Sequence, residues 1–188
     1  MKRLLFYLFL LLSVTRLQAQ EDFKKMKIEI LPESTLIIAG STNVNKFDCR
    51  FNNDLISKSI TVSYVQREIR LKFSDFDLKF LTDGFDCGNR RMNSDFQDLL
   101  VAEHYPDIVI SVDKIELVSS EYVKAFITVQ IAGNENCYEF PVQTGNDRFE
   151  GKFKINIRDF NIEPPKKALG LIEVDEMIEV QFNLKIKR

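Results

Sequence analysis

Apolar and polar residues alternate with a period of two over most of this 188-residue chain. Near the C-terminus, Ile178, Val180 and Phe182 alternate with acidic and amide residues, and the same pattern runs over residues 123–131 and 153–157. A period of two predicts β-strands with one buried face. Further strand candidates lie around Ile28 and over residues 36–39, 47–51, 60–64, 69–73, 76–80, 108–117 and 138–142.

Clusters of turn residues separate these segments, and no linker or domain boundary interrupts them. The clusters are FNND at residue 51, TDG at 82, AGNEN at 132, TGND at 144 and EPP at 163. Many strands with one-sided apolar faces predict an all-β antiparallel barrel or sandwich. We favour an extended antiparallel barrel of about eight strands, because closing the sheet removes exposed strand edges.

One stretch has helical spacing instead. Its apolar residues, at i, i+4, i+7 and i+8, are Met92, Phe96, Leu99 and Leu100. This stripe predicts one short amphipathic helix of about ten residues. Asn93 or Ser94 can cap its N-terminus, and Pro106 is expected to mark its end. Such a helix would cover an open end or seam of the barrel, either as structural cover or as a lid over a ligand.

The N-terminus has the features of a secretory signal peptide. Lys2 and Arg3 precede an apolar run over residues 4–12, and the small residue Ala19 follows. The run is shorter than the roughly 20 apolar residues that span a bilayer. We therefore expect cleavage after residue 19, a mature domain over residues 20–188, no stable transmembrane anchoring, and a periplasmic or secreted location.

The charge balance argues against nucleic-acid binding. The chain has 26 basic and 28 acidic side chains, and cleavage after residue 19 would remove three basic ones and no acidic one, which changes the net charge from −2 to −5. Nucleic-acid binders gain affinity from clustered Lys and Arg. Here charges of both signs are interspersed along the strand candidates, as on a solvated surface.

Three cysteines, Cys49, Cys87 and Cys137, cannot all pair within one chain. Their spacing contains no CxxC or Cys/His zinc pattern, so we expect no metal site and no cofactor. In an oxidising, exported setting Cys49 and Cys87 are one candidate pair, with Cys137 buried or free. Three buried thiols are the alternative.

Catalytic chemistry has little support in the sequence. His104 is the single histidine, and it lies near the end of the expected helix, where a cation is favourable on structural grounds alone. The acidic pairs Asp75/Asp77 and Glu173/Asp175 have no positioned partner. We therefore expect a protein that is not an enzyme.

Three stretches carry a resemblance to a known family. They are GSTNVNKFDCRF at 40–51, FDCGNRRMNSDFQDLLVAEHYPDIVISV at 85–112 and FKINIRDFNIEPPKKALGLIEVDEMIEVQFNLKI at 153–186. In order and spacing the chain resembles the YceI-like family of exported lipid-binding proteins. The most specific part is Met92 followed by the helix and Tyr105-Pro106-x-Ile108. The resemblance implies a lipocalin-like barrel whose apolar interior holds a polyisoprenoid.

An apolar cavity fits the composition, since 16 Phe and many Ile, Leu and Val residues are available. The candidate residues for lining it are Phe96, Leu100, Val123, Ala125, Ile127, Val129, Phe153, Ile155, Ile157, Val180, Phe182 and Leu184. Asn43, Asn45, Asn89 and Arg90 are candidates for contacting a headgroup, and Arg90 suits a phosphate. In the alternative, the barrel is filled by its own side chains and acts as a structural or protein-interaction module.

Overall fold

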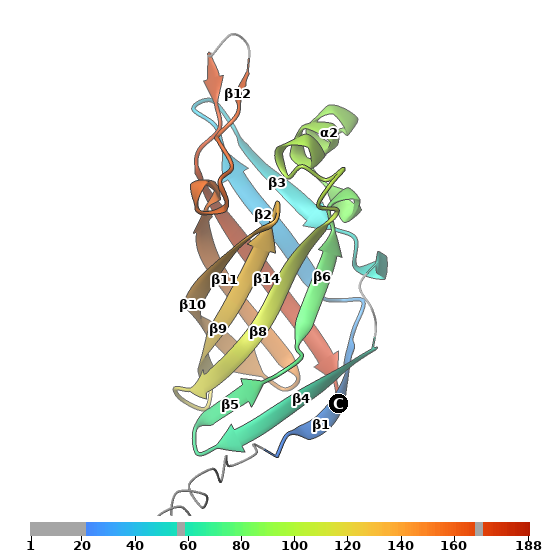
Figure 1. Ribbon diagram of the computed structural model, residues 1–188, viewed down its shortest axis with the longest axis vertical. Coiled ribbons are helices and arrows are strands. Elements are labelled where there is room, and N and C mark those ends of the chain that lie inside the picture. Colours follow the sequence, from blue (N-terminus) through green and yellow to red (C-terminus); the bar gives the residue numbers. More distant parts are fainter. Residues whose placement is uncertain (1–21, 56–58, 168–170) are drawn as a thin grey trace, which may run out of the picture.

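The computed structural model describes residues 22–55, 59–167 and 171–188, and it shows an elongated antiparallel barrel with one α-helix at its end (Figure 1). The strands are β1 (Lys24–Ile30), β2 (Thr35–Ser41), β3 (Lys46–Phe51), β4 (Ser59–Arg67), β5 (Arg70–Phe73), β6 (Asp77–Leu81), β7 (Phe85–Asp86), β8 (Asp107–Leu117), β9 (Tyr122–Ile131), β10 (Asn134–Gly145), β11 (Arg148–Asn156), β12 (Lys166–Lys167), β13 (Ile172–Glu173) and β14 (Met177–Lys187). The helices are α2 (Arg90–Leu99) and the 3-10 helices η1 (Asn53–Leu55), η2 (Thr82–Gly84) and η3 (Ile157–Phe160).

The expected signal peptide over residues 1–19 lies outside the described residues. Within the described part of the chain, no helix is long and apolar enough to span a membrane.

Eight strands close into a ring, which confirms the predicted fold class. The order is β1-β4-β5-β8-β9-β10-β11-β14, and β14 pairs back to β1 through Glu29 with Lys187 and Ile30 with Ile186. All of these pairings are antiparallel.

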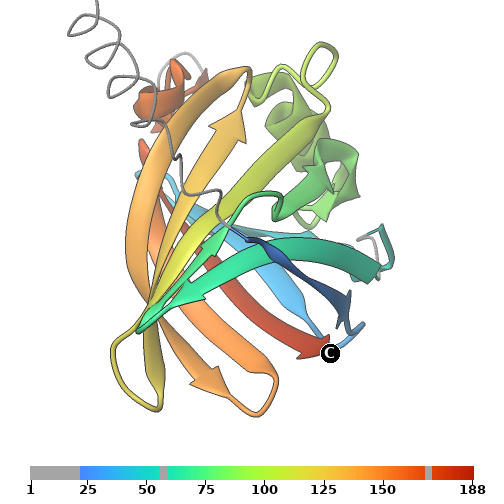
Figure 2. The same ribbon diagram turned by 60° about the horizontal axis from the view of Figure 1, so that its bottom comes forward.

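The two ends of the ring are built differently (Figures 1 and 2). At the upper end of Figure 1, β8 pairs with β6, whereas β14 pairs with β2 and the sheet continues through β3 to β7. In the described part of the chain no strand ladder joins β6 to β3. We call the gap between β3 and β6 the seam. The lower end, which comes forward in Figure 2, is closed by β1, β4 and β5.

The interior follows the predicted alternation. In β9 the buried residues are Val123, Ala125, Ile127, Val129 and Ile131. Their neighbours in the strand are partly buried or exposed, so one face of β9 points into the barrel. The alternate residues of β10, β11 and β14 join the same apolar core.

The helix is present but its ends differ from the prediction. Asn89, rather than Asn93 or Ser94, is the N-cap, and its Oδ1 accepts a hydrogen bond from the Met92 amide at 3.0 Å. Asn93 lies inside the helix. Its side-chain Oδ1 accepts a hydrogen bond from the Cys87 amide, at 2.7 Å.

The prediction that the helix ends at Pro106 is also wrong. The last helical residue is Leu99, and Val101 adopts a left-handed conformation with φ of 54°. The amides of His104 and Tyr105 then donate to the Val101 carbonyl in a turn. Pro106 comes after this turn, immediately before β8.

A hairpin that the alternation did not indicate extends beyond the upper end of the barrel. Strands β12 and β13 form a separate sheet, with Lys166 opposite Glu173 and Lys167 opposite Ile172. It is the highest part of the fold in Figure 1.

Candidate functional site

The upper half of the barrel contains a cavity of about 20 Å³ with a wholly apolar lining. The lining residues are Leu36, Ile38, Phe80, Phe85, Ile108, Ile110, Val129, Ile131, Phe153, Ile155, Ile178 and Val180. They come from β2, β6, β7, β8, β9, β11 and β14. A space of this size holds about one water molecule, and a site without polar partners does not retain one.

Four of the predicted cavity residues line this space, namely Val129, Phe153, Ile155 and Val180. The other eight do not line it. Val123, Ala125 and Ile127 are buried in β9, Ile157 is buried in η3, and Leu100 is buried beyond α2, whereas Phe96, Phe182 and Leu184 are partly buried.

Eight lining residues were not among those predicted, namely Leu36, Ile38, Phe80, Phe85, Ile108, Ile110, Ile131 and Ile178. All but Phe85 lie in segments whose alternation was recognised, so the period of two could have identified their inward face. Phe85 lies in the two-residue strand β7, which is too short for a period.

Aromatic rings fill the barrel below the cavity. The rings of Phe140 and Phe153 stack with centroids 4.2 Å apart and planes 6° apart. Phe182 meets Phe140 edge-on at 6.0 Å and lies over Gly151. A Cβ atom at Gly151 would come within 2.7 Å of the Phe182 ring, so a larger residue here would require the ring to shift.

The short helix η3 closes one side of the upper end. Phe160 is only 1% exposed and its ring is near that of Tyr138. The Tyr138 hydroxyl donates to Asp159 at 3.2 Å, and burial together with the Asp159 carboxylate raises the pKa of Tyr138 well above its ordinary range. The carboxamides of Asn134 and Asn136 donate to the Phe160 and Asp159 carbonyls. These bonds hold η3 against β10.

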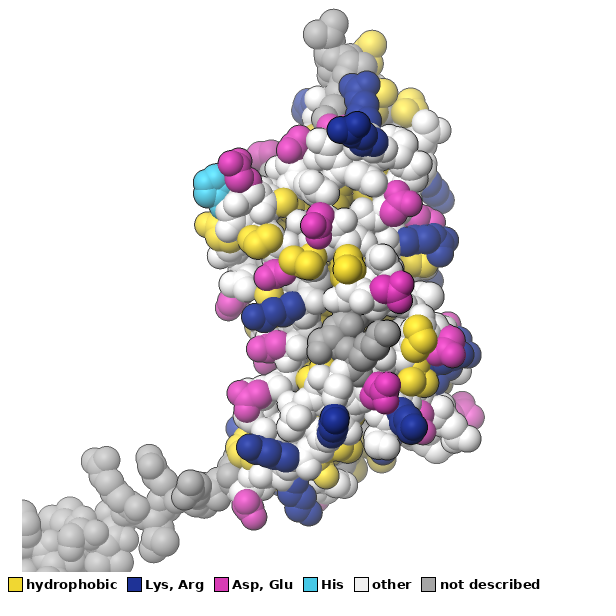
Figure 3. Space-filling model, turned by 90° about the vertical axis from the view of Figure 1, so that its right-hand side faces the viewer, with side chains coloured by type: hydrophobic (Ala, Val, Ile, Leu, Met, Phe, Trp, Pro, Cys, Tyr) yellow, Lys and Arg dark blue, Asp and Glu magenta, His cyan; other side chains and the backbone are white. Residues whose placement is uncertain are grey.

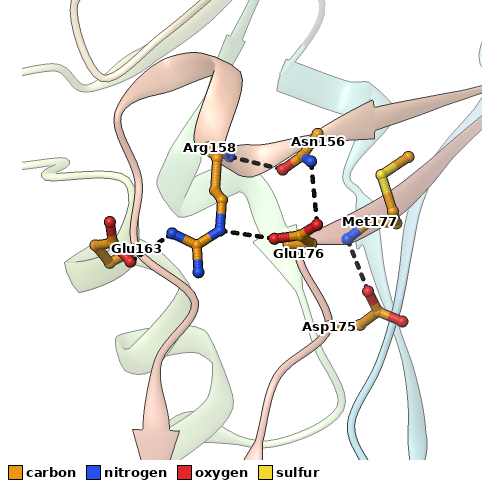
Figure 4. Close-up of polar contacts among 6 residues, drawn as sticks. All are labelled: Asn156, Arg158, Glu163, Asp175, Glu176 and Met177. Atoms are coloured by element: carbon orange, nitrogen blue, oxygen red, sulfur yellow. Dashed lines mark hydrogen bonds and ion pairs between the residues drawn. The ribbon is translucent and has the colours of Figure 1, made fainter.

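An ion-pair cluster fixes the segment that follows η3 (Figure 4). Arg158 Nε donates to Glu176 at 2.6 Å, and its NH1 group bonds Glu163 at 2.8 Å. The hydrogen bond that Arg158 donates to Glu176, and then the charge of Glu163, raise the pKa of Arg158. The Asn156 carboxamide donates to the same Glu176 carboxylate. All four side chains are occupied with one another, which is a structural arrangement at the base of the β12–β13 hairpin.

Side chains close the seam in place of a strand ladder. Phe51 of β3 meets Phe80 of β6 edge-on at 5.2 Å, and it meets Phe85 at 4.9 Å. Phe96 of α2 packs on Phe85 at 5.2 Å. Since Phe80 and Phe85 also line the cavity, α2 is one aromatic ring away from the barrel interior.

A disulfide joins Cys49 of β3 to Cys87, just after β7. Both residues are buried beside the aromatic cluster of the seam. The bridge ties the segment that leads into α2 to the edge of the sheet. Cys137 is free and exposed on β10, with its Sγ 3.7 Å from the Thr128 hydroxyl.

The predicted headgroup residues lie in two separate places. Asn43 and Asn45 belong to the turn between β2 and β3, where the Asn43 carboxamide donates to the Leu171 carbonyl at 3.0 Å and accepts from the Glu173 amide at 3.1 Å. Asn89 caps α2, and Arg90 is the exposed first residue of that helix. The carboxamides of Asn43 and Asn89 are therefore engaged with backbone.

The polar residues considered for catalysis are dispersed. His104 is exposed in the turn after α2. Asp77 accepts from the Ser111 hydroxyl, and Glu173 pairs with Lys166 at 3.1 Å. Among the described residues, no group of three or more His, Cys, Asp or Glu side chains could hold a metal ion.

Several solved structures share this fold. BcnA of Burkholderia cenocepacia matches with a TM-score of 0.63 at 15% identity, over 83% of this chain and 97% of its own. A polyisoprenoid-binding domain from Saccharophagus degradans matches with 0.57 at 11% identity, over 85% and 96%. The YceI protein of Campylobacter jejuni matches with 0.56 at 18% identity, over 74% and 84%. A comparison with curated proteins gives no match.

A closed antiparallel ring of eight strands around an apolar interior places the protein in the class of lipocalin-like barrels. The profile of the YceI-like domain matches residues 81–186, which is more than half of the chain. The protein belongs to the YceI-like family, as the resemblance of its sequence stretches indicated.

Proposed function

We propose that the protein is an exported, non-enzymatic lipid-binding protein that sequesters or carries an apolar, isoprenoid-type ligand in the barrel interior. The observation that carries this proposal is the wholly apolar lining of the upper half of the barrel. The fold shared with a polyisoprenoid-binding domain supports it. An apolar chain placed there gains roughly 0.8 kcal/mol for each methylene removed from water.

Binding requires the barrel to open, because ligand sites usually enclose roughly 300–1,000 Å³ and the cavity has about 20 Å³. We place the opening at the seam, since packed rings rather than a ladder hold β3 against β6. Movement of α2 with Phe96 and Phe85 would extend the cavity towards Arg90. The Arg90 guanidinium would then be positioned to pair with a phosphate headgroup.

A second candidate function has its own support. The same small cavity fits a barrel filled by its own side chains, which would act as a structural or protein-interaction module. Mass spectrometry of organic extracts from natively purified protein separates the two functions. A copurifying isoprenoid supports the carrier. An extract without lipid, together with no binding of a fluorescent isoprenoid, rejects it.

Two neighbouring residues of β2 offer a matched test of where the ligand lies. Ile38 lines the cavity, whereas Ile37 points to the outer face. Ile38→Trp should fill the interior and abolish isoprenoid binding, at a cost of about 1–3 kcal/mol in stability. Ile37→Trp should bind as the wild type does. Equal binding by the two variants would contradict a ligand in the barrel.

Export is tested separately by N-terminal sequencing of protein from an envelope or extracellular fraction. We expect the mature chain to begin at Gln20. A mature chain that begins at Met1 would contradict the signal-peptide interpretation.

A further inference from the structure

The helix α2 ends in a conformation that its sequence does not favour. The amide of Val101 donates to the Asp98 carbonyl at 3.1 Å, and the amide of Ala102 donates to the Gln97 carbonyl at 3.0 Å. These two bonds form a Schellman motif, in which the residue after the C-cap is left-handed and is usually glycine. Here that residue is Val101, with φ of 54°. A β-branched side chain disfavours this conformation, so the turn is strained.

Burial of the side chain does not offset this strain. Val101 is 43% exposed, so it gains little from packing. Figure 3 shows the side of the molecule that carries this turn, where the single histidine of the chain, His104, is cyan and apolar side chains are exposed beside it. Of the described non-glycine residues with positive φ, Val101 alone is β-branched, and the others are Glu68, Ala132, Asp147 and Asn161.

The chain is fixed on both sides of Val101, and this holds the turn in its strained form. On the helix side, Leu100 is buried in the apolar core. On the strand side, the amide and the hydroxyl of Thr82 both donate to the Pro106 carbonyl, at 2.8 and 3.0 Å. Surroundings that fix both flanks can hold a residue in an unfavourable conformation. Release of Leu100 would therefore allow the turn to relax.

The first turn of α2 is held in a different way. Cys87, which precedes the helix, is bonded to Cys49 through the disulfide. The Asn93 side chain accepts a hydrogen bond from the Cys87 amide at 2.7 Å, and Asn89 caps the helix. The helix is thus anchored at its first turn and strained after its last turn. The last turn, which leads into Leu100, is therefore the part that opens most readily.

We propose that Val101 is the strained hinge of a lid, and that the last turn of α2 opens over the seam when Val101 leaves the left-handed conformation. Phe96 begins this turn and packs on Phe85, which lines the cavity. Opening would separate these two rings and expose this side of the barrel interior. The residue at position 101 then sets how often the lid opens. The hinge stands on this geometry, and its control of ligand passage rests on the proposed function.

Hydrogen exchange of the mature protein, resolved by NMR for single amides, tests the hinge without a ligand. A left-handed backbone disfavours valine relative to glycine by about tenfold, and the greater freedom of glycine in the open turn reduces this difference to about fivefold. Val101→Gly should therefore raise the protection factors of the amides of residues 100–102 by about fivefold. Val101→Ile keeps the β-branched side chain and should leave them unchanged. In both variants, β9 should keep its wild-type protection.

Two results would overturn the hinge. One is equal protection of residues 100–102 in the glycine and isoleucine variants. The other is an equal rise in α2 and β9, because it would mean that the strain affects only global stability. A second left-handed residue, Glu68 at φ of 49°, lies in the β4–β5 turn at the lower end (Figure 1) and supplies a control. Glu68→Gly should leave the protection of residues 100–102 unchanged.

Stopped-flow mixing with a fluorescent isoprenoid tests the effect on ligand passage. A lid changes the rates of entry and exit by the same factor. Val101→Gly should therefore slow association and dissociation alike, by about fivefold, and leave Kd unchanged. Glu68→Gly should bind at the wild-type rates. A change in Kd with an unchanged association rate would contradict the lid.

Failure of the lid is distinguishable from failure of the proposed function. A protein that binds the isoprenoid at rates that Val101→Gly does not alter keeps the proposed function and rejects the lid. A protein that binds no isoprenoid but shows the expected change in protection supports the hinge and rejects the carrier.

Discussion

The two halves of the barrel share β8, β9, β10, β11 and β14, but they are closed in different ways. In the lower half, β1 pairs with both β4 and β14, so backbone hydrogen bonds run around the ring. In the upper half, β3 and β6 face each other across the seam, where the rings of Phe51 and Phe80 pack together, while the disulfide joins β3 to the segment that follows β7. A ladder fixes each residue in register, whereas packed side chains can separate and repack. The upper half is therefore the part through which the proposed ligand would enter.

Removing the disulfide should have the largest effect on this contrast. In the chain-entropy model, a bridge across 38 residues contributes about 4 kcal/mol to stability. We expect Cys49→Ala with Cys87→Ala to lose about this much in denaturant unfolding. In hydrogen exchange, protection should fall first in α2, β3 and β7 and should persist in β9. The control is Cys137→Ala, at the exposed free cysteine. A uniform loss of protection would show that the two halves are equally rigid.

Truncating the aromatic packing of the lower half should cost slightly less. Phe182 lies over Gly151 and contacts Phe140, so Phe182→Ala should lose about 3 kcal/mol. The matched control is Phe126→Ala, since this ring lies on the outer face of β9 beneath Lys114. Thermal unfolding measures both. A loss at Phe182 no larger than that at Phe126 would mean that the lower half is not tightly packed.

Disturbing the helix should affect ligand retention in the upper half. Phe96→Ser with Leu100→Ser removes the apolar contact between α2 and the seam. Exposing two ligand methylenes to water would cost about 1.6 kcal/mol, which corresponds to an approximately tenfold faster release. The measurement is the dissociation rate of a fluorescent isoprenoid, with far-ultraviolet circular dichroism to verify the sheet. An unchanged rate in a folded variant would make α2 structural cover only.

The smallest effect concerns Tyr138 and high pH. Because its pKa is raised in the folded protein, the stability that this residue contributes is complete below the ordinary tyrosine pKa of about 10 and is lost as pH rises above it. Tyr138→Phe should therefore lose less stability between neutral and strongly alkaline pH than the wild type. A tyrosinate absorbance titration should show one late-titrating group only in the wild type. Identical titrations would contradict burial of the hydroxyl beside Asp159.

The alternation of residues predicted much of the fold because it reports a local property, the face of a strand. It therefore identified the inward residues of β9 and the apolar stripe of α2. The alternation could not show where a strand ends when a polar side chain ends the strand by capping the next element. Ile157 continues the period of Phe153 and Ile155, yet Asn156 caps η3 there and turns the chain across the barrel.

The candidate site was harder to predict, because it depends on which strands are neighbours. Leu36 and Ile38 of β2 line the cavity because β2 pairs with β14, which lies at the opposite end of the sequence. Likewise, Asn43 looked available for a headgroup, but its carboxamide holds a hairpin more than 120 residues away. Long-range pairing decides both roles, and no local pattern encodes it.

The pairing of Ile30 with Ile186 closes the ring, and it also determines when the ring can form during synthesis of the chain. Strand β1 pairs with β4 and with β14, and β14 is translated last of the three. The entropy of joining such distant segments has to be lost before the final contacts form, which makes ring closure a late step in folding. A growing chain therefore cannot close the ring before β14 has been synthesised.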